Sequence, residues 1–77
     1  MEGKSMKILT QSRQSIFDFT GDVWVTEALE GGLVVAEKAS GSPYIGTYKD
    51  LNRAAEVLNE IFQYYRNGKK SYIMPLE

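Results

Sequence analysis

The stretch PYIGTYKDLNRAAEVL, residues 43–58, has the outline of a phosphate-binding loop, because an apolar strand runs through one glycine into an amphipathic helix. A phosphate loop needs several backbone N–H groups around the anion, and therefore several glycines or a Gly-x-x-x-x-Gly-Lys-Ser/Thr spacing. This stretch has only Gly46, and Asp50 places a negative charge where the anion would sit. We therefore expect Gly46 to allow a close backbone approach, or a bulge near the end of a strand.

Acid–base and metal chemistry lack their usual residues. The chain has no histidine and no cysteine, which removes the commonest general base, the commonest zinc ligand and any disulfide. Glu27 and Glu37 could face each other across a hairpin, but such acids usually form the solvated side of a sheet. No Asp-x-Asp pattern suggests a magnesium or calcium site. The sequence predicts no enzyme, no metal and no cofactor, and the absence of cysteine fits a cytoplasmic protein.

Aromatic side chains could stack on nucleobases, and three short strands before a helix resemble DNA-reading modules such as the AP2-like domains of recombinases. The charge pattern disfavours nucleic acid, because residues 15–37 contain five acids and no Lys or Arg, and the net charge is −1. One basic cluster remains at Arg66, Lys69 and Lys70. A nucleic-acid-associated accessory protein that uses this cluster is the alternative hypothesis.

Trp24 is the strongest candidate for contact with a protein partner. Val23 and Val25 alternate with Trp24, so if the valines face the core, the Trp24 ring is exposed or covered by a partner. The reversed register would make Trp24 a core residue. A free sheet edge at residues 44–48 or 71–75 would favour a homodimer. The candidate partner-binding residues are Trp24, Tyr44, Tyr48 and Tyr72.

The elements that position these residues change type near residue 50. Before it, apolar residues alternate or form short runs between turn residues, which indicates strands. The glycines of EGG, residues 30–32, predict the centre of a hairpin turn. The predicted strands are residues 6–9, 15–19, 23–29, 33–39 and 44–48, with a short terminal strand at 71–75.

After residue 50 the apolar spacing becomes helical. Asp50 is the expected N-cap and Gly68 the expected left-handed residue after the last turn. The predicted helix has about sixteen residues, a length read from this 3.6-residue periodicity. Its predicted apolar face comprises Leu51, Ala54, Ala55, Leu58, Ile61, Phe62 and Tyr65.

Strands followed by a helix predict an α+β fold, with four to five antiparallel strands, the helix on one face of the sheet and a short terminal strand. A chain of 77 residues is expected to form one domain, at residues 6–77. Residues 1–5 are expected to be a non-native or disordered leader. The longest apolar run is residues 33–36, and the N-terminus has no signal-peptide pattern, so no membrane association is expected.

Three segments carry a family resemblance: MKILTQSRQSIFD (residues 6–18), IGTYKDLNRAAEVLNEI (45–61) and YIMP (72–75). The chain resembles a family of short uncharacterised proteins of Gram-positive bacteria, often encoded by prophages or mobile elements. It departs from the family pattern after Gln11, where an acidic residue is more usual. The resemblance implies a fold and a genomic setting but no catalytic residues. The leading hypothesis is a non-catalytic protein-interaction module of phage or mobile-element origin.

Overall fold

The computed structural model describes residues 6–19, 22–36 and 41–77. The predicted α+β class is confirmed. The leader expected at residues 1–5, and the end of the predicted strand at 37–39, lie outside the described residues. The elements are β1 (Met6–Leu9), β2 (Ile16–Phe19), β3 (Val23–Ala28), β4 (Gly31–Ala36), β5 (Tyr44–Tyr48), α1 (Leu51–Arg66) and β6 (Ser71–Ile73).

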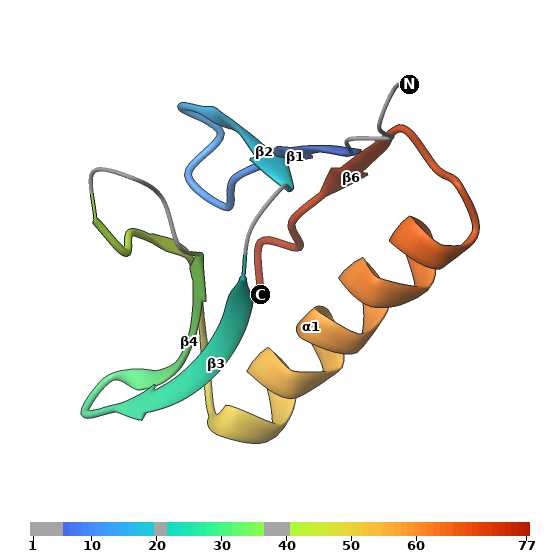
Figure 1. Cartoon of the computed structure of the whole chain (residues 1–77). Coiled ribbons are helices and arrows are strands. Elements are labelled where there is room, and N and C mark those ends of the chain that lie inside the picture. The colour runs from blue at the N-terminus through green and yellow to red at the C-terminus, as the bar shows by residue number, and fades with distance from the viewer. Residues whose placement is uncertain (1–5, 20–21, 37–40) are drawn as a thin grey trace.

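The strands form two sheets of three, in the orders β2-β1-β6 and β3-β4-β5 (Figure 1). The prediction of one antiparallel sheet is wrong in this respect. β6 pairs with β1 in parallel, whereas β1–β2, β3–β4 and β4–β5 are antiparallel. Parallel pairing needs a long crossover, and the chain between β1 and β6, which includes α1, provides it. Such non-local pairing has no signature in the three residues of β6.

The β3–β4 hairpin does not turn at its glycines. Its tip is Leu29–Glu30, and Gly32 pairs with Glu27 inside the ladder. A Cβ on Gly32 would lie 2.7 Å from the carbonyl carbon of Asp50 and 2.9 Å from Ala54 Cβ. Gly32 therefore allows the start of α1 to approach the sheet closely, a tertiary need that overrides the turn signal of the glycine pair.

The helix ends follow the sequence closely. The Asp50 carboxylate accepts a hydrogen bond of 2.8 Å from the Arg53 backbone N–H, as an N-cap should. Asn67 follows the last helical residue, and Gly68 has a φ of 74°. Both predicted ends of the helix are confirmed, and α1 has 16 residues.

Helix α1 packs across the β3-β4-β5 sheet and also reaches β6 (Figure 1). Its buried residues are Ala54, Val57 and Ile61. The predicted apolar face omitted Val57 and was displaced toward one side. The core cluster draws on both sheets and the helix: Met6, Ile8, Phe17, Val34, Ala36, Ile45, Tyr48, Ala54, Val57, Ile61, Tyr72 and Met74.

Candidate functional site

One flank of α1 is apolar without being covered. Ala55, Leu58 and Phe62 follow each other at steps of three and four residues, one position round the helix from the buried row. Ala55 is exposed, Leu58 is half-buried and Phe62 keeps 53% of its surface exposed. The apolar arc of the helix is therefore wider than the face that the core uses.

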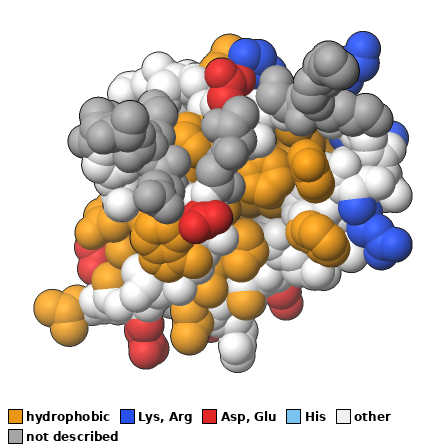
Figure 2. All heavy atoms as spheres, viewed as in Figure 1, with side chains coloured by type: hydrophobic (Ala, Val, Ile, Leu, Met, Phe, Trp, Pro, Cys, Tyr) orange, Lys and Arg blue, Asp and Glu red, His pale blue; other side chains and the backbone are white. Residues whose placement is uncertain are grey.

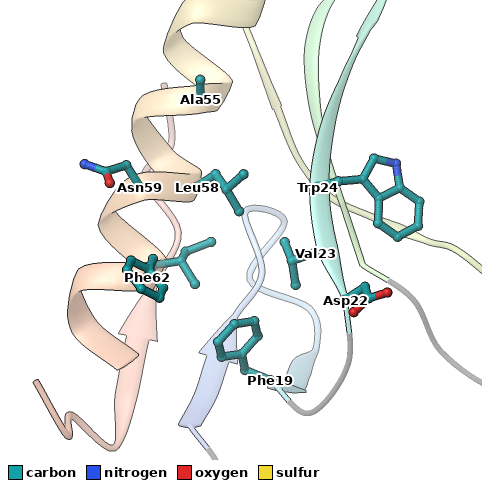
Figure 3. A pocket seen from close by; sticks show the side chains of 9 residues that line it. Phe19, Asp22, Val23, Trp24, Ala55, Leu58, Asn59 and Phe62 are labelled. Atoms are coloured by element: carbon teal, nitrogen blue, oxygen red, sulfur yellow. The ribbon is translucent and has the colours of Figure 1, made fainter. Parts of the chain in front are cut away.

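This flank forms one wall of an open groove of about 700 Å³ between α1 and β3. Figure 3 shows Leu58 on the helix pointing toward Val23 on β3, with Phe19 at the far end, and Phe62 also lines the groove. The Phe19 ring packs edge-to-face on Tyr65, with ring centroids 5.2 Å apart, which fixes that end. In Figure 2, apolar side chains gather over the middle of the same side of the molecule.

The other wall of the groove is an edge strand. β3 is the outermost strand of its sheet and pairs only with β4. Within the described residues, no backbone hydrogen bond joins residues 22–28 to any element other than β4. An edge strand presents alternate N–H and C=O groups outward, so these groups of β3 lie open beside the apolar groove.

The charged residues described from 22 to 30, on and beside β3, all have one sign. Asp22, Glu27 and Glu30 are exposed, and none of the three makes an ion pair or a side-chain hydrogen bond within the described part of the chain. Residues 15–37 contain no Lys or Arg. The edge strand therefore carries unbalanced negative charge.

The structure places Trp24 on the face of the sheet turned away from the helix. Val23 and Val25 pack against the core, whereas Trp24 is 39% exposed, and Figure 3 shows its ring pointing away from Leu58 and Phe62. The register in which the valines face the core is therefore the observed one. Across the sheet, Trp24 pairs with Val35, and Val35 pairs with Tyr44, which is 65% exposed. Trp24 and Tyr44 thus share one row on the outer face.

Tyr48 and Tyr72 lie in the core, each only 3% exposed, so they offer no surface to a partner. The Tyr48 hydroxyl donates to the Pro75 carbonyl at 2.9 Å, and the Tyr72 hydroxyl donates to the Glu60 carboxylate at 2.5 Å. Burial raises the pKa of Tyr48 to about 12. Burial and then the hydrogen bond to Glu60 raise the pKa of Tyr72 above its usual range. Both hydroxyls therefore stay protonated at neutral pH and serve the packing.

Gly46 lies in a crowded part of the fold. Tyr44 and Gly46 pair with consecutive residues of β4, so Ile45 is the extra residue of a bulge. A Cβ on Gly46 would lie 2.7 Å from Tyr48 Cε2 and 2.8 Å from Met74 Cε. Of the two roles predicted for Gly46, the bulge is observed directly beside it, whereas the close approach is made by the side chains of Tyr48 and Met74 and not by backbone.

Gln11 covers the edge of β5 that was expected to be free. Its side-chain carbonyl accepts from Thr47 N at 2.7 Å, its side-chain amide donates to Thr47 O at 2.8 Å, and its backbone N–H donates to Ile45 O at 3.0 Å. One residue thus imitates a neighbouring strand. The expectation of a free edge at residues 44–48 is wrong, because the loop after β1 occupies it.

The basic and acidic clusters that were considered for other chemistry stay dispersed or solvated. Arg66, Lys69 and Lys70 are exposed around the end of α1. Glu27 lies opposite Gly32, and Glu37 lies outside the described residues. In the described ranges no three acids cluster as metal ligands would, and no helix there is long and apolar enough to cross a membrane.

Comparison of the chain with protein-family models, with curated proteins and with solved structures gave no match. Function must therefore follow from the geometry of the site. Ala55, Leu58 and Phe62 were predicted to belong to the helix face that packs on the sheet, and the open groove beside them was not predicted. One signal was present: the apolar arc of the helix includes both Phe62 and Tyr65, which is more than one sheet face can cover.

Proposed function

We propose that the protein is a non-catalytic protein-interaction module that binds its partner along the open edge of β3, in the groove against α1. One observation carries the proposal: an apolar groove of about 700 Å³ lies directly beside a strand whose outer edge is unpaired. Grooves of this kind bind protein segments through both apolar contact and main-chain pairing. The exposed Trp24 on the same strand adds the type of side chain that anchors protein interfaces.

The genomic origin and the cellular compartment of the protein are part of the same proposal. The resemblance to short Gram-positive proteins of prophages and mobile elements suggests a cytoplasmic protein whose partner is a host or phage protein. The absence of cysteine in the chain fits that compartment. Under this proposal the protein acts by binding to a surface of another protein. The groove can provide that binding surface without any catalytic group.

Affinity capture from a Gram-positive lysate tests the proposal. Wild type is compared with Phe62→Glu, which puts a charge into the groove, and with Trp24→Ala on the outer face. Leu29→Glu is the matched control, because Leu29 lies fully exposed at the hairpin tip outside the groove. Far-ultraviolet circular dichroism confirms that each variant retains its helix.

We expect wild type and Leu29→Glu to recover the same proteins, and Phe62→Glu to lose them. Trp24→Ala should reduce recovery, because the aromatic anchor is removed while the groove remains. Recovery of one identical set by all four proteins, or of nothing by any of them, would show that this groove is not a protein-binding site.

A further inference from the structure

We propose that the partner presents an extended segment in which apolar residues alternate with Lys or Arg, and that this segment adds to β3 as a fourth strand of the β3-β4-β5 sheet. The inference rests on the proposed function and names the chemistry of the partner at the same groove. It follows from the geometry of the edge, from the two faces of β3 and from the charges beside them.

The two faces of β3 differ in what they can bind. Side chains of an added strand point alternately to opposite faces of the sheet. One set would point into the groove, toward Val23, Leu58 and Phe62, and must therefore be apolar. The other set would lie beside Trp24 and Asp22, whose side chains both point away from the helix in Figure 3.

A cationic side chain suits this second set. A Lys or Arg there could approach the Asp22 carboxylate and the face of the Trp24 ring together, combining charge attraction with a cation–π contact. Farther along, Glu30 adds negative charge at the hairpin tip, whereas Glu27 alternates with Trp24 and lies in the same row as Val23 and Val25. Since none of these three carboxylates has an ionic partner in the described residues, a basic segment would balance charges that the chain leaves open.

The β3 strand of a second copy fits the edge less well, because that strand brings the same acids and no cation. Two β3 strands pairing antiparallel about Val25 would set Glu27 opposite Val23, a carboxylate in the apolar row. Pairing about Thr26 would set Asp22 opposite Glu30, and like charges facing each other are destabilising. Pairing about Trp24 avoids those contacts but still doubles the negative charge along one ladder.

Synthetic peptides test the inference directly. The probe is a fluorescein-labelled, acetylated peptide, Lys-Val-Lys-Val-Lys-Val-Lys, about as long as β3 at roughly 3.3 Å per residue. The charge control replaces every Lys with Glu. Fluorescence anisotropy with the full chain should show binding of the Lys peptide and at least ten-fold weaker binding of the Glu peptide. High salt should weaken binding of the Lys peptide, since it screens exposed charges.

Two further peptides separate strand addition from other binding. One carries N-methyl groups on its three valines, and the other carries them on its second, third and fourth lysines, so that each has three. An added strand uses the N–H groups of alternate residues only. One methylated peptide should therefore lose binding and the other retain it. Equal effects of the two patterns would overturn strand addition.

Two variants place the peptide on the chain. Phe62→Glu should abolish binding by filling the apolar side of the groove with charge, whereas Asp22→Asn should weaken the Lys peptide several-fold and leave the Glu peptide unweakened. Leu29→Glu again serves as the control, with unchanged or slightly tighter binding of the Lys peptide. Loss of binding in the control alone would place the peptide at the hairpin tip and contradict the groove.

The outcomes also separate this inference from the proposed function. If Phe62→Glu loses its lysate proteins but the Lys peptide does not bind wild type, the groove is an interaction site and the basic chemistry is wrong. If sedimentation shows a wild-type dimer that Phe62→Glu makes monomeric, a second copy occupies the edge and the inference is wrong. If neither peptides nor lysate proteins depend on Phe62, both proposals fail.

Discussion

Gly46→Ala is expected to destabilise the fold by about 2 kcal/mol, through crowding and the loss of one hydrogen bond, less a gain from the unfolded chain. The new methyl group would lie 2.7 Å from Tyr48 Cε2, 2.8 Å from Met74 Cε and 2.9 Å from Tyr48 Oη. Met74 Cε can move, but the Tyr48 ring is held by its hydrogen bond to Pro75 O. Overpacking costs about 1–3 kcal/mol and loss of that hydrogen bond about 1 kcal/mol. Alanine also lowers the conformational entropy of the unfolded chain, which offsets about 0.4–1 kcal/mol of this destabilisation.

Urea unfolding followed by far-ultraviolet circular dichroism measures the change. For a domain of this size, a loss of about 2 kcal/mol corresponds to a fall of about 8–16 °C in Tm. In a Tyr48→Phe background, Gly46→Ala should cost about 1 kcal/mol less, because the hydrogen bond is already gone. A Gly46→Ala protein within about 0.5 kcal/mol of wild type would refute this account of Gly46, and so would strict additivity with Tyr48→Phe.

Two further outcomes follow from the same packing. Gly32→Ala should destabilise more than Gly46→Ala in the same urea assay, because its methyl group would meet the backbone at Asp50 rather than the flexible end of a side chain; an equal or smaller loss would show that α1 can shift freely. Stability should also fall as pH rises from about 10 toward 12. The pKa of Tyr48 is about 12 in the folded chain but about 10 when unfolded, so above pH 10 the unfolded state binds fewer protons and is favoured. Tyr48→Phe should flatten that decline in a titration of unfolding free energy, and an unchanged slope would contradict the stated role of Tyr48.

Local signals in the sequence predicted local structure well. Helical spacing, the Asp50 cap and Gly68 defined α1, because each depends on neighbours within a few residues. The alternation of Val23, Trp24 and Val25 predicted that Trp24 lies on the face opposite the two valines, but it left open which of the two faces packs on the core. These features succeed together because propensity, capping and hydrophobic pattern agree there.

Features that depend on distant contacts were not predictable in the same way. The Gly31–Gly32 pair satisfies a turn preference, yet Gly32 is needed where α1 crosses the sheet. The parallel pairing of β6 with β1 joins opposite ends of the chain. Tyr48 and Tyr72 appeared suited to a surface by residue type, but each hydroxyl finds a partner in the fold and so can be buried.

Residues from three separate segments, 6–18, 45–61 and 72–75, meet in one place. Gln11 pairs with the backbone of Thr47, Gly46 makes room for Tyr48 and Met74, and Tyr48 holds Pro75. Contacts among these three segments thus connect the two sheets. A motif can therefore mark a fold while saying nothing of the surface through which the protein acts.

The surface proposed for function lies elsewhere, and its clue was the same charge pattern that disfavoured nucleic acid. A strand with Asp22 and Glu27 and no cation repels phosphates, and that repulsion does not extend to a basic protein segment. Edge strands commonly carry charge to prevent self-association, and under the proposal the acids on and beside β3 would oppose a second copy of the chain while favouring a cationic strand. The apolar flank of α1 borders the open edge of β3. A single added strand would therefore contact both surfaces: its apolar side chains would give affinity in the groove, and its cationic side chains would give specificity on the outer face.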